Sequence, residues 1–495
     1  MDSTQNPTTD PQRLALPIKP VSESLKQSAG TCSAGTSTLA GIDSVRAAAA
    51  VGVVALHAGA PYLKNPMPGL AWSIRDQSSS VVDFAFWSIE LVIMPVFLVI
   101  AGFFAWQSLS RSTPVAMVKT RSKRLLIPLA FAMVVVLPLD LYAWVLGWVA
   151  EGWVEPVKLR SLKFDGVIDQ NLWGLSHLWF LQYLFLYILV LAVGKHVANR
   201  RRERTRSHSI SHLGQGPAAR PSLFWTLSVG WFVVAAVVVW LRPHVVWGFQ
   251  HAFFPVPSKW LYHGLFFAAG VGLAIGDPKM LRLSAVAPRL VIPCLMLGVA
   301  TVSLGQWHLG RWQQAQNETL AAVDGQASVT SNLFAEPMLA VMTPFAALAI
   351  TLAMIGVSVA KIRQVPVAIE YLAAASFWVY LVHHPILGLV HVDLKWFAGD
   401  AISPALKAFA ACVVSLTVSL LTFEALVRKT QFGRMLGMNY SLRTSEQPAG
   451  ANTAIGAGNI DVISIEFGQT GAGSAARHST PTDDRGDQHQ PRRAA

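Results

Sequence analysis

A charged pair and a histidine share one predicted membrane helix near the start of the chain. Asp43 and Arg46 are three residues apart, so they lie on the same helix face. His57 follows Arg46 eleven residues later, a rise of roughly 16 Å along a helix. An imidazole at that depth in a bilayer is costly to bury, which indicates a functional role. The alternative is a helix-capping ion pair and a histidine bonded to a neighbouring helix.

Three more ionisable side chains are predicted at a similar depth. Glu90 lies inside the second apolar segment, His177 begins the fourth, and His383 lies inside the ninth. A carboxylate can hold the tautomer of an imidazole and stabilise the imidazolium, so Glu90 beside His57 would make a general base. The alternatives are a hydrogen bond from Glu90 to a Trp or Ser, and interfacial packing of His177 and His383.

Two arginines begin the third apolar segment. Arg121 and Arg124 are three residues apart and share a helix face, so their guanidinium groups could form a fork for phosphate. The alternative is that they only set membrane topology, as most basic loops do.

The composition is that of a membrane protein. The 495 residues are 53% hydrophobic and 13% charged, whereas a soluble domain averages about 25% charged residues. The net charge of +12 lies largely in short loops between apolar segments, so we expect no nucleic-acid partner and a lipid bilayer around the chain. Three scattered cysteines give neither a disulfide framework nor metal-ligand spacing, and we expect no metal site.

The apolar segments predict an all-α polytopic fold with about ten transmembrane helices, each near the ~20 residues needed to cross a bilayer. Residues 1–40 and 440–495 are polar and predicted to be disordered tails, flanking a transmembrane domain over residues 41–435. Residues 1–40 also lack the apolar core of a signal peptide. The predicted spans are residues 43–63, 81–106, 125–149, 177–195, 222–241, 259–276, 288–306, 335–359, 366–391 and 403–427.

Basic loops predict the orientation of these spans. Lys and Arg concentrate after the even-numbered spans, most strongly in residues 195–206. The positive-inside rule then places both tails in the cytoplasm of a cell whose inner (plasma) membrane holds the chain. Arg46, Arg121 and Arg124 lie near the cytoplasmic face in this orientation, and His57 lies in the outer half of the membrane.

Five short segments, taken together, resemble the acyltransferase-3 family of integral membrane enzymes. Each is weak alone, but all five occur in the family's order and on the expected spans. They are the Asp43, Arg46 and His57 spacing; MPVFLVIAGF at 94–103, with Ala101 where a serine is common; RSKRLLIP at 121–128; HLWFL at 177–181; and ASFWVYLVH at 375–383. The HLWFL segment is similar to the glucan biosynthesis protein C branch.

The resemblance implies transfer of an acyl group from cytoplasmic acyl-CoA, the donor substrate, to a hydroxyl of a carbohydrate, without a tightly bound cofactor. It implies an essential histidine at His57 and a donor site at Arg121 and Arg124. We expect Arg46, near the same membrane face, to bind acyl-CoA with them. The branch implies succinyl transfer to a glucan, and acetyl transfer to another surface carbohydrate stays open. We expect His177, Trp179 and His383 to bind the acceptor, with the indole of Trp179 as a sugar-stacking face.

Two other classes of protein fit part of the pattern. Intramembrane His and Glu also form proton relays, so a proton-coupled transporter is an alternative. Transporters usually carry an internal repeat, and none is visible between the halves of this chain. The second alternative is a non-catalytic membrane scaffold, which would keep its function after His57→Ala.

Overall fold

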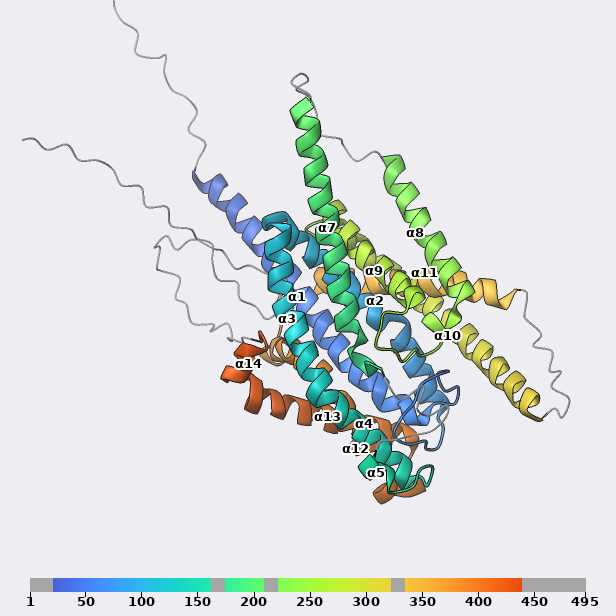
Figure 1. The fold of residues 1–495 in the computed structure, drawn as a ribbon. Coiled ribbons are helices and arrows are strands. Elements are labelled where there is room, and N and C mark those ends of the chain that lie inside the picture. The colour runs from blue at the N-terminus through green and yellow to red at the C-terminus, as the bar shows by residue number, and fades with distance from the viewer. Residues whose placement is uncertain (1–20, 162–173, 209–220, 322–333, 439–495) are drawn as a thin grey trace, which may run out of the picture.

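The computed structural model describes residues 21–161, 174–208, 221–321 and 334–438, and every regular element within them is helical (Figure 1). This confirms the predicted all-α polytopic class. Of the two predicted disordered tails, residues 1–20 and 439–495 lie outside the described residues. Helix α1 begins at Val21, so it starts inside the segment that the composition assigned to the N-terminal tail.

The helices follow one another in the order that the apolar segments predict. Their bounds are α1 Val21–Gly59, α2 Ser80–Arg111, α3 Pro114–Phe131, α4 Leu137–Ala150, α5 Lys158–Ser161, α7 Trp179–His208, α8 Pro221–Leu241, α9 Pro257–Gly276, α10 Leu281–Ala321, α11 Ala335–Lys361, α12 Val367–Ala398, α13 Pro404–Thr422 and α14 Gln431–Met435. A π-helical segment, Ala132–Val136, joins α3 to α4. The two therefore form one continuous helical segment, Pro114–Ala150, that is long enough to cross a bilayer.

Eight candidate membrane spans are long and apolar enough to cross a bilayer in the described part of the chain. The two other predicted spans correspond to α8, whose apolar stretch Thr226–Leu241 is shorter, and to α9. Hydropathy therefore located every long helix in the described residues, while two helices are much longer than predicted: α1 begins at Val21 rather than residue 43, and α10 ends at Ala321 rather than residue 306.

Helices α1, α2 and α12 form the centre of the domain. The most apolar stretch of each is 67%, 61% and 72% buried respectively, whereas that of α10 is only 22% buried. Helix α1 packs against α12, α2 and α11, and α10 and α8 lie to one side of the domain (Figure 1). Exposed apolar side chains on α10, such as Ile292 and Met296, form a surface suited to lipid. The three central helices also carry most of the polar groups described below.

Helices α2 and α9 approach each other through two glycines. A Cβ atom on Gly102 would lie 2.0 Å from the carbonyl oxygen of Phe267, and a Cβ on Gly270 would lie 2.0 Å from the carbonyl oxygen of Val99. Only glycine permits this backbone contact, which is how membrane helices reach their closest packing. The contact fixes α9 against the helix that carries Glu90.

We predict that Gly270→Ala destabilises the protein, because the new methyl group overlaps the α2 backbone. Overpacking of this kind costs about 1–3 kcal/mol. Gly272→Ala is the matched control, since a Cβ there meets nothing within 4 Å. Thermal unfolding of the two detergent-purified variants measures the difference, and equal melting temperatures would contradict the packing described for α2 and α9.

Candidate active site

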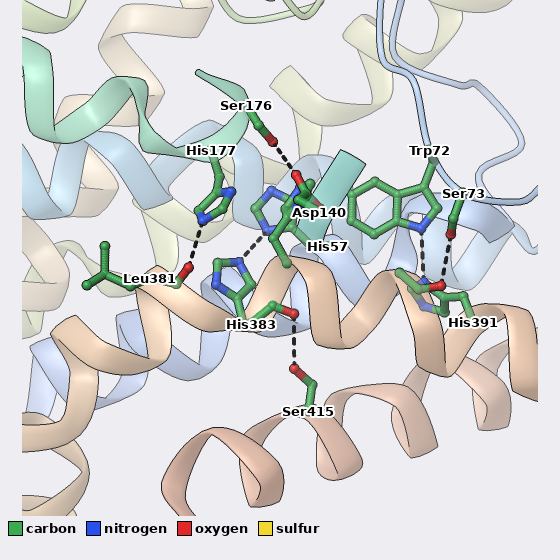
Figure 2. A network of polar contacts seen from close by, with 12 residues as sticks. His57, Trp72, Ser73, Asp140, Ser176, His177, Leu381, His383, His391 and Ser415 are labelled. Carbon is green, nitrogen blue, oxygen red and sulfur yellow. Dashed lines mark hydrogen bonds and ion pairs between the residues drawn. The ribbon is translucent and has the colours of Figure 1, made fainter. Parts of the chain in front are cut away.

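Two histidines from the central helices α1 and α12 meet at the core of the site. His57 Nδ1 lies 2.9 Å from the carbonyl oxygen of Val53 and 3.2 Å from Nε2 of His383 (Figure 2). His57 is half-buried, whereas His383 is fully buried. The structure therefore brings together two of the histidines that the sequence placed in the outer half of the membrane.

The hydrogen bonds of His383 fix the tautomers of both rings. Nδ1 of His383 lies 2.8 Å from the carbonyl oxygen of Tyr380 and 3.0 Å from that of Val379. Carbonyl oxygens only accept, so in neutral His383 the proton sits on Nδ1, and Nε2 accepts from Nδ1–H of His57. The lone pair of His57 is then on Nε2, which makes no hydrogen bond within the described residues. A bare Nε2 is the atom that a general base needs.

A second imidazole is held by a carboxylate. His384 Nδ1 donates to Asp140 Oδ1 at 2.7 Å, and Ser176 Oγ donates to Asp140 Oδ2 at 3.0 Å (Figure 2 shows the serine contact). Asp140 lies in the first turn of α4 and is 1% exposed. The ring of His384 lies 4.9 Å from that of His57, centroid to centroid, and Asp140 interacts electrostatically with His57. The carboxylate is therefore placed to stabilise a positive charge on either ring.

His177 lies beside this pair but does not complete a metal site. Its Nε2 donates to the carbonyl oxygen of Leu381, and its Nδ1 is buried without a hydrogen bond. Ligand atoms of Asp140, His177 and His384 lie within 4.8 Å of one another. The two imidazoles are stacked at 14°, however, and a nitrogen lone pair lies in its ring plane, so two nearly parallel rings cannot both point at one ion. We assign the cluster to proton chemistry.

These side chains border a small cavity of about 60 Å³. His57, His177 and His384 form one part of its wall, and Trp179, Glu90 and Lys259 form another. His383 does not line this cavity and is fully buried beside His57. It is therefore placed to orient His57 rather than to bind the acceptor, which is the role that we predicted from the sequence. The cavity has room for a reacting group, not for a whole substrate.

Glu90 shares the cavity with His57, but the predicted pairing of the two is not observed. No hydrogen bond joins them in the described structure, and the charge that acts on Glu90 is that of Lys259 on α9. The carboxylate near His57 is Asp140 instead. Position along α2 brings Glu90 to the cavity of His57, whereas its closeness to Lys259 depends on the packing of α2 against α9.

Lys259 occupies a face of Trp179, the residue that we predicted to stack on the sugar acceptor. Its Nζ lies 3.9 Å from the centroid of the Trp179 ring and 5.2 Å from that of Phe249. The ammonium thus covers a face of the indole that we predicted to stack on sugar. In the described residues no hydrogen bond or ion pair within 4 Å is formed by Lys259, which lines the cavity.

The predicted arginines lie away from the histidines. Arg46 bonds Asp43 at 3.0 Å and the carbonyl oxygen of Ala373 at 3.3 Å, and it is 3% exposed. Arg121 is 2% exposed and Arg124 half-buried, both in α3. Arg121 precedes Asp140 by nineteen residues, roughly 28 Å along a straight helix. A side chain that serves only as a topology signal would be solvated, so the burial of Arg121 indicates a further role.

The fold and the site define a polytopic membrane protein with a polar reaction centre inside its helical core. The chain matches the family model of the acyltransferase domain (Acyl_transf_3) over residues 39–424 and belongs to this family. It is therefore a membrane acyltransferase. Neither the comparison with curated proteins nor that with solved structures gave a match.

Sequence reasoning missed several residues of the site. His384 follows His383 directly and precedes Pro385, and a histidine doublet in an apolar helix is a visible signal. Asp140 interrupts the apolar third span, and Lys259 opens the sixth. Ser176 gave no signal, since only the fold places its hydroxyl against Asp140.

We predict that Asp140→Asn lowers kcat for acyl transfer by about 10²-fold or more, because the imidazolium loses its carboxylate. Initial rates of acyl transfer by purified protein measure this. Asp83→Asn is the matched control: Asp83 is equally buried but contacts Asn65 and Gln306 rather than a histidine. Similar losses of activity in both variants would assign the effect to folding and contradict the role of Asp140.

Proposed function

We propose that this acyltransferase moves an acyl group, succinyl or acetyl, from cytoplasmic acyl-CoA to a hydroxyl of a glucan or another surface carbohydrate. The observation that carries the proposal is the bare Nε2 of His57 on the wall of a cavity inside the membrane domain. The family supplies the class of reaction, and His57 supplies the base that O-acylation needs.

In the proposed reaction, Nε2 of His57 takes the proton of the acceptor hydroxyl while the oxygen attacks the thioester carbonyl carbon. The tetrahedral intermediate collapses, the carbon–sulfur bond breaks, and CoA leaves as the thiolate, which recovers the proton from His57. General-base assistance of this kind contributes roughly 10²–10⁴-fold in rate. Asp140 and the acceptor nitrogen of His383 stabilise the imidazolium during this cycle.

Lys259 is the group that we propose for the developing oxyanion. It lines the same cavity as His57, and its ammonium contacts the ring of Trp179 but forms no hydrogen bond or ion pair among the described residues. A fixed cation in a site without bulk water stabilises a negative charge far more than it would in solvent. Glu90, on the neighbouring helix α2, lines the same cavity and interacts electrostatically with Lys259.

The donor would lie along α3, with its phosphates at Arg121 and Arg124 and Arg46 near them. The separation of roughly 28 Å between Arg121 and Asp140 along the helix requires a long carrier, which suits CoA. In this arrangement both termini are cytoplasmic, the chain lies in the inner membrane, and the acceptor arrives from the outer side.

We predict that His57→Gln abolishes acyl transfer while membrane insertion and thermal stability are kept. Gln retains a hydrogen-bond donor for His383 but provides no base. His308→Gln is the control, because His308 lies on α10 and lines a separate cavity. Product formation is measured by mass spectrometry of the acceptor. Near wild-type turnover by the His57 variant would contradict the proposed role of His57 as the base.

We predict that Arg121→Lys and Arg124→Lys weaken acyl-CoA binding but leave acceptor binding nearly unchanged. Lysine keeps the charge and loses the bidentate geometry that matches phosphate. Loss of one charge-assisted hydrogen bond, about 1.5–3 kcal/mol, reduces affinity roughly tenfold to over a hundredfold. Calorimetric titration of detergent-purified variants with CoA decides this, since unchanged affinity in both would leave these arginines only a structural or topological role.

A further inference from the structure

A second, larger cavity opens next to the histidine site. Its volume is about 320 Å³, a size typical of small-ligand sites. Three indoles, those of Trp72, Trp148 and Trp153, form its walls, and Arg75 lies at its mouth. Trp153 is 51% exposed and Arg75 is also exposed, so a ligand can reach both side chains from outside.

The indoles are held in place by their own N–H groups and by one turn. Nε1 of Trp72 donates to Nδ1 of His391 at 2.9 Å (Figure 2), and Nε1 of Trp148 donates to the carbonyl oxygen of Trp72 at 2.8 Å. Gly152, with φ of +72°, ends α4 in a left-handed turn that returns the backbone N–H of Trp153 to the carbonyl oxygen of Trp148. Walls fixed in this way bind a ligand without a large ordering cost.

The mouth of the cavity is braced from a third element. Lys395, near the end of α12, forms an ion pair with Glu151 and donates to the carbonyl oxygen of Arg75. The backbone of Arg75 is therefore fixed, while its guanidinium makes no hydrogen bond or ion pair within the described residues.

The two cavities are neighbours that share part of their walls. Ala60 and Leu70 line both of them. Trp72, which lines the outer cavity, also stacks on His57 at 5.9 Å and 17° and meets His384 edge-on at 4.7 Å. The wall that a ligand in the outer cavity would touch is therefore in direct contact with the histidine cluster.

The chemistry of these walls selects a carbohydrate. The C–H bonds on one face of a sugar ring carry a partial positive charge and are attracted to the negative face of an indole. The donors of Arg75 match hydroxyl oxygens at the edge of the ring. The acyl donor fits poorly here, because its phosphates require several cations and this cavity offers one.

We propose that the Trp72–Trp148–Trp153 cavity binds a segment of the glycan acceptor and directs one of its hydroxyls into the cavity of His57. This inference rests on the proposed function, because it assumes a carbohydrate acceptor. It replaces Trp179 as the sugar-stacking residue.

The test separates acceptor binding from chemistry. We expect Trp153→Ala and Arg75→Ala to raise KM for a linear glucose oligosaccharide about tenfold, as loss of an anchoring aromatic or arginine residue usually does, and to leave kcat and the KM for acyl-CoA unchanged. Trp396→Ala is the matched control, because Trp396 is 73% exposed near the end of α12 and does not line this cavity. An unchanged KM in both cavity variants, or an equal rise in the control, which would indicate an interfacial tryptophan belt, overturns the proposal.

A binding measurement keeps the inference distinct from the proposed function. The inactive His57→Gln protein is titrated with the same oligosaccharide, and tryptophan fluorescence reports occupancy. Saturable binding that Trp153→Ala weakens supports the cavity even if the wild-type protein acylates no sugar, an outcome in which the proposed function alone fails. No saturable binding to the protein with intact tryptophans overturns the cavity proposal.

Discussion

The hydrogen bond between His57 and His383 is the interaction on which the site depends. It joins the two central helices α1 and α12, and it can form only because the Nδ1 proton of His383 is committed to backbone carbonyls of its own helix. That commitment leaves an acceptor for His57 and sets its lone pair on the other ring nitrogen. Backbone geometry, rather than a neighbouring carboxylate, thus fixes the orientation of the proposed base. Ser415 on α13 donates to the carbonyl oxygen of His383 and holds the same turn from behind.

A water-poor cavity makes each remaining charge more effective. An acidic and a basic side chain lie at the same site, Asp140 bonded to His384 and Lys259 over the ring of Trp179. In a low dielectric such fixed charges act strongly on a histidine that has gained a proton or on an oxygen that has gained negative charge. The buried arginine of α3 precedes Asp140 by nineteen residues along the continuous helix, which suits the proposed donor site at a distance from this centre.

The helical fold was predictable from hydropathy, because bilayer thickness imposes the length of each span and the long helices fall on the predicted segments. The convergence of His57, His177 and His383 was also predictable, since their positions along their helices place them at a common level. Rotation about the helix axis was not. Glu90 faces Lys259 instead of His57 because of packing between α2 and α9, and Trp179 meets an ammonium because Lys259 lies on that same helix. The Asp140–His384 bond required knowledge of which helices adjoin, which no spacing within one segment supplies.

Acyl transfer across a membrane, with donor and acceptor on opposite sides, is the most direct test of the proposed mechanism. Purified protein is reconstituted in vesicles, with isotopically labelled acyl-CoA supplied only on the side of the Arg121 end of α3 and a glucose oligosaccharide only on the other side. The proposed mechanism predicts labelled acyl ester on the oligosaccharide, with free CoA on the donor side, and no ester when the two substrates exchange sides. Ester that forms only when both substrates share one side, or thioester hydrolysis without labelled sugar, would contradict it.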